Sequence, residues 1–391
     1  MPGDFLATEL DEIKRQGLYR HLRQVEGEQG PTILLDGQEV LNLSSNNYLG
    51  LANHPAIQAA AKEAIDRYGC GSGGSRLISG NTTLHLELEE RIARFKGAEA
   101  ALVFNSGFQA NVGIPSTLVG EGDVIFSDAL NHASIIDGCR LSRARVVVYR
   151  HCDLDQLESD LKKTPQNSRR LIVTETVFSM DGDIAPIREI VDLAEHHGAM
   201  VMVDEAHATG VFGANGAGVV AEMGLGERVL VQMGTLGKAL GVFGAYVAGN
   251  RNLGELLINR CRSFIFTTSL PPVVLAMAIT AIGLLEKEPE RRRALCDNSQ
   301  TLRVGLKRLG FSLGHSGSQI IPLMVGETSK CMKLTQLLLQ KGVYAQGIRP
   351  PTVPSGTSRL RITPMATHSQ EQMERALRVF KEVKEDNDLR P

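Results

Sequence analysis

The sequence VMVDEAHATG, residues 201–210, ends a short apolar run with an aspartate and places a histidine three positions later. An uninterrupted apolar run of this length is typical of a strand buried on both faces, as in a parallel sheet. Ligand sites of parallel sheets lie beyond the carboxyl ends of the strands. Asp204 and His207 are therefore candidate site residues. In isolation, a helix-capping aspartate followed by a structural histidine explains the pattern equally well.

Short β-rich runs recur on both sides of this stretch and alternate with helical segments. We expect strands at residues 100–104, 123–126, 146–149, 171–175, 200–203, 230–233 and 245–248. Helices fit between most of them, for example at 186–197, where Gly198 stands in the position that ends a helix. The alternation predicts an α/β fold whose sheet is mostly parallel and covered on both faces.

The two ends of the chain have a different pattern. Residues 4–24 have helical spacing, and residues 32–43 form two apolar runs around Asp36-Gly37, a strong hairpin signal. A long apolar helix is predicted from Pro271 to about 286, followed by a charged helix at 288–309 and a looser mixture of strands and helices. We therefore predict three parts: an N-terminal arm and hairpin (1–45), a large domain (46–285) and a smaller α+β C-terminal domain (286–391).

Composition excludes several classes of function. The 391 residues include 42 Lys plus Arg and 44 Asp plus Glu, which gives a net charge of −2. The chain therefore lacks the excess of positive charge that binding to nucleic acid or an anionic membrane requires. The longest apolar stretches fall short of the ~20 residues that cross a bilayer. The acidic N-terminal sequence is unlike a signal peptide. The six cysteines are scattered without metal-binding spacing, so we expect reduced thiols, no bound metal and a cytoplasmic protein.

A lysine in a glycine-rich turn is the second chemical signal. The stretch GTLGKALG, residues 234–241, follows a predicted strand and places Lys238 next to Gly237. Lysines are usually solvated, but the small neighbours leave room for a flat ligand, and a desolvated lysine is an effective amine nucleophile. Thr235 and nearby backbone N–H groups can hold a phosphate. The pattern lacks the full spacing of a nucleotide-binding P-loop.

Three further stretches follow predicted strands. FNSGFQAN (104–111) opens a helix whose N-terminal N–H groups favour a phosphate, VFSMDGD (177–183) is a strand-end loop, and DALNHASIIDG (128–138) places His132 near a helix start. Each is weak alone. Together, a lysine, a carboxylate and a phosphate cradle match the needs of pyridoxal phosphate (PLP), which takes up the electrons of a substrate carbanion.

The sequence resembles the α-oxoamine synthases, a branch of the fold-type I, aspartate aminotransferase-like PLP enzymes. The motifs SSNNYLGL, GSGGSRLISG, DALNHASIIDG, FSMDGD, VDEAHATG, GTLGKALG and FTTSLPP occur in the family's order over nearly the whole chain. The resemblance implies a PLP-dependent transferase with a large, mostly parallel seven-stranded domain and a small C-terminal domain. It also implies a homodimer whose sites lie at the subunit interface.

The resemblance also implies roles for individual residues. Lys238 would bond covalently to PLP, Asp204 would pair with the ring nitrogen, His207 would bond the phenolic oxygen and His132 would stack on the ring. The remaining cofactor contacts would come from Gly107, Phe108, Ser179 and Thr235, with Thr267 or Thr268 reaching the phosphate of the other subunit. Arg361 and Asn46 would bind the amino-acid carboxylate, while Arg20 and Thr352 would contact the acyl substrate.

The substrates are suggested by one C-terminal stretch. IRPPTVPSGTSRLRIT, residues 348–363, resembles family members that condense L-alanine with a pimeloyl thioester, carried by coenzyme A or an acyl carrier protein, in biotin biosynthesis. GTLGKALG and FSDALNHASIIDG also resemble 2-amino-3-ketobutyrate CoA ligase, which uses glycine and acetyl-CoA. A plain aminotransferase and a non-catalytic relative are further alternatives, and the intact Lys238, Asp204, His207 and His132 argue against the last.

Overall fold

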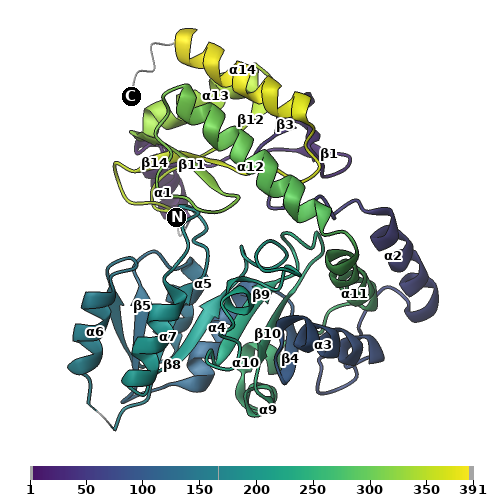
Figure 1. The fold of residues 1–391 in the computed structure, drawn as a ribbon, viewed down its shortest axis with the longest axis vertical. Helices are drawn as coiled ribbons and strands as arrows, with labels where there is room; N and C mark the ends of the chain where they lie inside the picture. Colours follow the sequence, from purple (N-terminus) through teal and green to yellow (C-terminus); the bar gives the residue numbers. More distant parts are fainter. Residues whose placement is uncertain (1–2, 166, 387–391) are drawn as a thin grey trace. The chain divides into compact units, whose positions relative to one another are not determined.

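The structure is a computed structural model that describes residues 3–165 and 167–386 (Figure 1). It contains two compact units. One consists of residues 46–295, and the other combines residues 1–45 with residues 296–391. The division predicted above, into residues 1–45, 46–285 and 286–391, stays a prediction about the domains of the chain.

A seven-stranded sheet forms the centre of the unit 46–295, with the order β4-β10-β9-β8-β7-β5-β6. Its strands are β4 (Ala100–Phe104), β5 (Val124–Asp128), β6 (Arg145–Tyr149), β7 (Arg170–Glu175), β8 (Met200–Asp204), β9 (Val231–Thr235) and β10 (Ala245–Gly249). Pairs among β5 to β9 are parallel, and only β10 runs antiparallel to its neighbours β9 and β4. The predicted seven-stranded, mostly parallel sheet is therefore confirmed.

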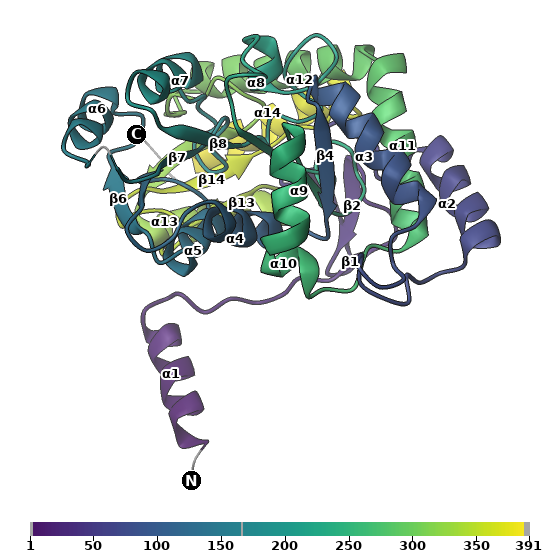
Figure 2. The same cartoon turned by 90° about the horizontal axis from the view of Figure 1, so that it is seen from below.

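Helices cover both faces of this sheet, as its unbroken apolar strands require (Figure 2). Helices α4 (Gly107–Leu118), α5 (Ala133–Leu141), α9 (Arg251–Arg260) and α10 (Arg262–Ile265) share one apolar core with the strands. Helices α6 (Leu154–Lys162) and α7 (Ile187–His196) lie on the opposite face. Helices α2 (Pro55–Tyr68), α3 (Thr83–Lys96) and α11 (Pro272–Lys287) pack together near β4, and the short α8 is Val219–Glu222.

The second unit contains two small sheets. One has the order β1-β2-β3-β12, from Val25–Glu26, Thr32–Leu35, Gln38–Asn42 and Val343–Tyr344; the other has the order β11-β14-β13, from Ile321–Gly326, Ser358–Ile362 and Gln346–Ile348. The remaining helices are α1 (Asp4–Arg15), α13 (Thr328–Gln340), α14 (Gln370–Asp386) and α12 (Glu290–Arg308), whose first residues, up to Leu295, belong to the first unit. Because β3 pairs in parallel with β12, the N-terminal hairpin is built into the same sheet as the C-terminal region.

Two local results test the sequence interpretation of this unit. Asp36 and Gly37 both have positive φ angles, 51° and 79°, as the predicted two-residue hairpin turn requires. The helix predicted over residues 4–24 is too long: α1 ends at Arg15, because Gly17 adopts a left-handed φ of 66°. No helix within the described ranges is long and apolar enough to cross a membrane.

A buried ion pair fixes the chain just after β8. Lys96, at the end of α3, and Glu205 are both fully buried, and the Lys96 ammonium contacts the Glu205 carboxylate and the Ala217 carbonyl. The other Glu205 oxygen accepts the backbone N–H of Val220 at 3.0 Å. Burial alone would lower the pKa of Lys96. The charge of Glu205 and the contact of Lys96 with Tyr246 outweigh the effect of burial and raise that pKa. The pair therefore holds the segment that directly follows Asp204.

We expect Lys96→Ala to lower the free energy of unfolding by about 3–5 kcal/mol, because it leaves the Glu205 carboxylate buried without its partner. Denaturant or thermal unfolding of the variant measures the loss. Lys162→Ala, which removes an exposed partner of Glu158, is the control and should cost no more than about 0.5 kcal/mol. Equal losses in the two variants would contradict a special role for the buried pair.

Candidate active site

The predicted site residues of the large unit come from the carboxyl ends of neighbouring strands. Asp204 ends β8, Thr235 ends β9, and Lys238 lies in the turn after β9. Ser179 follows β7, and His132 follows β5. Strand β4 runs in the same direction as β9, because both are antiparallel to β10. The start of α4, which follows β4, therefore reaches the same edge of the sheet, where ligands of such folds bind.

A chain of hydrogen bonds starts at Lys238. Its Nζ lies 2.9 Å from His207 Nε2, and His207 Nδ1 lies 2.7 Å from the Tyr48 hydroxyl. Tyr48 in turn donates to Asn46 Oδ1 at 3.1 Å. Because the Tyr48 proton is used on Asn46, the Tyr48 oxygen accepts from His207 Nδ1–H, and His207 Nε2 accepts from Lys238. The structure thus brings the predicted residues Lys238, His207 and Asn46 together, and adds Tyr48, which sequence reasoning missed.

A second network surrounds Asp204, which is 5% exposed. One carboxylate oxygen accepts the N–H of Ala206 at 2.8 Å, and the other accepts the side-chain amide of Asn111 at 2.8 Å. The same amide donates to Ser134 Oγ at 3.0 Å. Buried carboxylates are costly unless they are hydrogen-bonded in this way. Asn111 and Ser134 were not predicted, although both lie inside motifs that the sequence analysis quoted.

His132 is joined to this network with a defined proton position. Its Nδ1 accepts the backbone N–H of Ser134 at 3.2 Å, so the ring proton of neutral His132 is on Nε2. Burial lowers the pKa of His132, and the nearby Lys238 lowers it further against the opposing charge of Asp204. His132 is therefore neutral at pH 7 and offers an Nε2–H donor.

The start of α4 forms an anion-binding cradle. Gly107 and Phe108 are its first two residues, whose backbone N–H groups have no partner within a helix. A Cβ on Gly107 would come within 2.7 Å of the Thr235 methyl group, so only glycine allows this approach. The buried Thr235 hydroxyl has no hydrogen-bond partner among the residues that the structure describes. A phosphate bound here would satisfy these groups.

Glu175 is a site residue that the sequence analysis did not identify. It ends β7 in register with Asp204 and is almost fully buried. The backbone N–H groups of His132 and Ser179 lie close enough to its carboxyl group to act against this burial and lower its pKa. Burial and the charge of Asp204 raise the pKa of Glu175 to about 8, so it is mostly protonated at pH 7. A strand that ends in glutamate gave no signal by itself, because its register with Asp204 depends on tertiary structure.

The other predicted residues lie elsewhere. In the smaller unit, Arg20 and Thr352 line a cavity of about 1510 Å³ together with Arg23 and Arg349, and Arg361 lies on β14 with 7% of its surface exposed. In the larger unit, Asn105 donates to Thr267 Oγ1 at 3.3 Å and to the Thr268 carbonyl at 2.7 Å, just after β4. The cavity therefore brings together the two residues predicted to contact the acyl substrate.

Comparisons with known proteins agree with this geometry. Residues 38–380 match the model of the aminotransferase class I and II family. The chain is 55% identical to an 8-amino-7-oxononanoate synthase of Geobacter sulfurreducens, over 95% of this chain and 96% of that protein. The chain belongs to the 8-amino-7-oxononanoate synthase family. The resemblance seen in the motifs is thereby confirmed.

Solved structures with this fold support the assignment. A serine palmitoyltransferase from S. paucimobilis, with a bound PLP–myriocin aldimine, is 37% identical with a TM-score of 0.93, covering 98% of both chains. An 8-amino-7-oxononanoate synthase from Francisella tularensis is 30% identical with a TM-score of 0.77, covering 89% of this chain and 98% of that one. The fold-type I PLP transferase fold is therefore confirmed.

The residues present fit PLP. The cradle at Gly107 and Thr235 suits its phosphate, the buried Asp204 carboxylate suits a protonated ring nitrogen, and Lys238 supplies a primary amine held by His207. The buried Thr235 hydroxyl that lacks a protein partner is the strongest single sign, because buried hydroxyl groups are rarely left unpaired.

We expect Tyr48→Phe to weaken PLP binding about fivefold to tenfold, because losing one buried hydrogen bond costs about 1–1.5 kcal/mol. Removal of the hydroxyl leaves His207 Nδ1–H without its acceptor and frees the ring that holds Lys238. Spectroscopic titration of the cofactor-free protein with PLP measures the dissociation constant. Tyr68→Phe, at the end of α2 and outside this hydrogen-bond chain, is the matched control; an equal weakening in both variants would contradict the role of the chain.

Proposed function

We propose that this protein condenses L-alanine with a pimeloyl thioester to give 8-amino-7-oxononanoate, carbon dioxide and free thiol, the reaction of biotin biosynthesis. The 55% identity over 95% of the chain to a curated 8-amino-7-oxononanoate synthase is the observation that carries this proposal. The site supports the proposal. Lys238 is hydrogen-bonded to His207, and the charges of Asp204 and Lys238 both act on His132. Asp204 is itself held by a hydrogen bond from Asn111.

PLP is the cofactor that this reaction requires, and when bound it takes up the electrons released at the α-carbon of the amino acid. We assign Lys238 to its covalent attachment and to proton transfer at the α-carbon. Asp204 would pair with the protonated ring nitrogen, and His207, whose Nδ1–H is donated to Tyr48, would contact the phenolic oxygen. The Gly107 and Phe108 N–H groups would hold the phosphate, and Ser179 and Thr235 would complete the polar contacts.

The substrate assignments follow from chemistry and from the resemblance. Arg361 pairs with the alanine carboxylate through its planar guanidinium, which fixes orientation as well as charge, and Asn46 assists. Arg20 and Thr352 contact the acyl substrate in the cavity that they line. His132 would stack on the cofactor ring, and its Nε2–H would donate to the acyl carbonyl oxygen, where negative charge develops during attack.

The same proposal extends to the assembly and location of the protein. The chain acts as a cytoplasmic homodimer in which Thr267 or Thr268 reaches the phosphate of the partner subunit.

Two other substrate pairs compete with this proposal. The serine palmitoyltransferase structures suggest serine with a long acyl thioester. The resemblance of GTLGKALG to 2-amino-3-ketobutyrate CoA ligase suggests glycine with acetyl-CoA.

We expect L-alanine with pimeloyl-CoA or pimeloyl-acyl carrier protein to give the fastest thiol release. The test pairs alanine, glycine and serine with pimeloyl, acetyl and palmitoyl thioesters. An acyl pocket separates chain lengths by only about 1–3 kcal/mol per methylene, so weak activity with neighbouring chain lengths is expected. A preference for glycine with acetyl-CoA would replace the proposal with the ligase activity, and a preference for serine with palmitoyl-CoA would replace it with the palmitoyltransferase activity.

We expect Asp204→Asn to lower kcat at least about 100-fold, a loss near 3 kcal/mol of transition-state stabilisation. A neutral amide cannot hold a proton on the ring nitrogen, so the cofactor becomes a weaker electron sink. In Asp204→Asn the remaining oxygen still accepts the Ala206 N–H, and a flip of the Asn111 amide turns its Oδ1, which has no partner among the described residues, toward the new NH2 group. The thermal unfolding midpoint should therefore change little. Asp192→Asn, on the surface of α7, is the control, and a near-normal kcat for Asp204→Asn would refute the role.

A further inference from the structure

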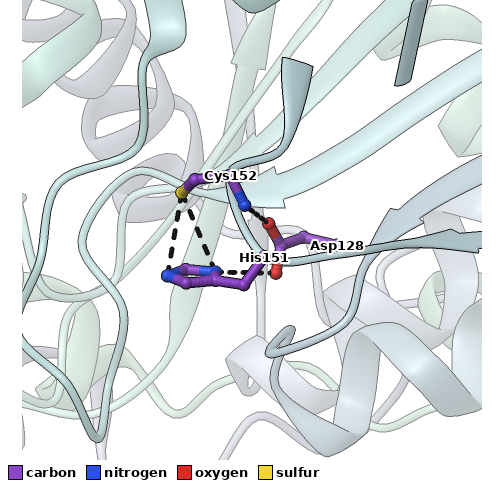
Figure 3. Close-up of side chains that lie close together, drawn as sticks. All are labelled: Asp128, His151 and Cys152. Atoms are coloured by element: carbon purple, nitrogen blue, oxygen red, sulfur yellow. Dashed lines mark hydrogen bonds and ion pairs between the residues drawn. The ribbon is translucent and has the colours of Figure 1, made fainter. Parts of the chain in front are cut away.

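His151 lies between two carboxylates outside the site residues assigned above. It follows β6, and its Nδ1 lies 3.0 Å from Asp128 Oδ1 at the end of β5. Its Nε2 lies 2.7 Å from Asp183 Oδ2, in the loop that follows β7. One imidazole therefore joins three segments that follow neighbouring strands of the sheet, and Figure 3 shows its contact with Asp128.

The ring carries a positive charge. Burial alone would lower the pKa of His151, but hydrogen bonds to Asp128 and Asp183 outweigh burial and raise that pKa to about 12. Because this folded-state pKa exceeds the ordinary value of 6.5, the stabilisation is complete below pH 6.5 and is lost only as the pH rises through about 12. At neutral pH both hydrogen bonds are charge-assisted, which makes them stronger than neutral ones.

The cluster of Asp128, His151 and Cys152 has the residue types of a metal site, and its ligand atoms lie within 4.8 Å of one another. The geometry favours an ionic clamp instead. Both ring nitrogens already point to carboxylates, and the Cys152 sulfur lies 3.8 and 3.7 Å from the two nitrogens, over the ring rather than in its plane (Figure 3). A metal ion would need a nitrogen lone pair in that plane.

Each carboxylate of the clamp belongs to a segment that carries a site residue. Asp128 also accepts the backbone N–H of Leu130 at 2.8 Å, two residues before His132. On the other side, the Asp183 carbonyl accepts the N–H of Phe178 at 3.1 Å and closes the loop that contains Ser179. The His151 ring also packs edge-on against the Phe178 ring, with 4.4 Å between the ring centroids.

We propose that His151 is a positioning residue, which holds the segment of His132 and the loop of Ser179 in the arrangement that binds the cofactor. The inference rests on the proposed function, because the cofactor contacts of His132 and Ser179 belong to it. The backbone N–H groups of the same two residues also lie near the Glu175 carboxyl group within the site.

The first test uses the protein without cofactor. In His151→Gln, backbone amides of residues 128–132 and 177–183 should exchange with deuterium about tenfold faster than in the wild type, because local opening becomes easier. Arg228→Gln is the control: it breaks the more exposed ion pairs of Arg228 with Asp192 and Glu195 of α7, outside the site. Its exchange should rise around α7 and not in the two segments. Unchanged exchange in His151→Gln would overturn the proposal.

The second test measures the dissociation constant for PLP by absorbance. His151→Gln should weaken binding about tenfold, as misplaced binding groups do, whereas Arg228→Gln should leave it unchanged. Asp183→Asn keeps the shape of the clamp and removes one charge, so it should weaken binding less; it also serves if His151→Gln does not fold. Failure of the wild type to bind PLP would refute the proposed function, whereas equal binding by wild type and both clamp variants would refute the role of His151 alone.

Metal analysis completes the test. Protein purified without chelator and dialysed against buffer should retain less than about one tenth of an equivalent of zinc, because the ring nitrogens are already occupied. One equivalent of zinc in the wild type, lost in both His151→Gln and Cys152→Ser, would overturn the clamp in favour of a metal site.

Discussion

A carboxylate held almost out of contact with water is the constraint on which the site depends. Asp204 is 5% exposed, and a carboxylate in that position is tolerated only when the protein supplies donors. Asn111 and the N–H of Ala206 supply them. The adjacent Glu175 relieves the repulsion between two neighbouring carboxylates by keeping its own proton, since its pKa is raised to about 8. The backbone N–H groups of His132 and Ser179 lie near this neutral carboxyl group.

The parallel sheet explains why so many chemically different groups meet around this carboxylate. Each strand end delivers a segment to one edge, and neighbouring strands lie about 5 Å apart, so adjacent segments are within reach of side-chain hydrogen bonds. Lys238, His132 and Ser179 are far apart in sequence but follow β9, β5 and β7. The ionic clamp at His151 and the ion pair of Lys96 and Glu205 lie outside this cluster and restrain the segments that carry it.

Most of the architecture could be predicted from local patterns. All seven strands of the large sheet were expected within a few residues, because uninterrupted apolar runs between turn residues are a strong signal. The end of α1 was missed because leucine spacing continued past Gly17, where a left-handed backbone outweighs the apolar pattern. The short β13 has only three residues, too few for a local pattern to predict it.

The site was partly predictable for a similar reason. Residues inside motifs, such as Lys238 and Asp204, were found because their chemistry and position are both unusual. Tyr48, Glu175 and His151 act through partners that are distant in sequence, and no local pattern reports such pairing. The three-dimensional structure brings these partners within hydrogen-bonding distance.

The pairing of β3 with β12 affects the order in which the protein can fold during synthesis. Residues 46–295 form a continuous unit, whereas the strands at residues 32–42 must wait for a partner strand at residues 343–344, some three hundred positions later. Closing so long a loop is slow, although its entropic cost grows only gradually with length. On the ribosome, the cofactor-binding unit can therefore assemble first. The apolar side chains of the N-terminal hairpin stay exposed to chaperones until the partner strand, in the last eighth of the chain, emerges.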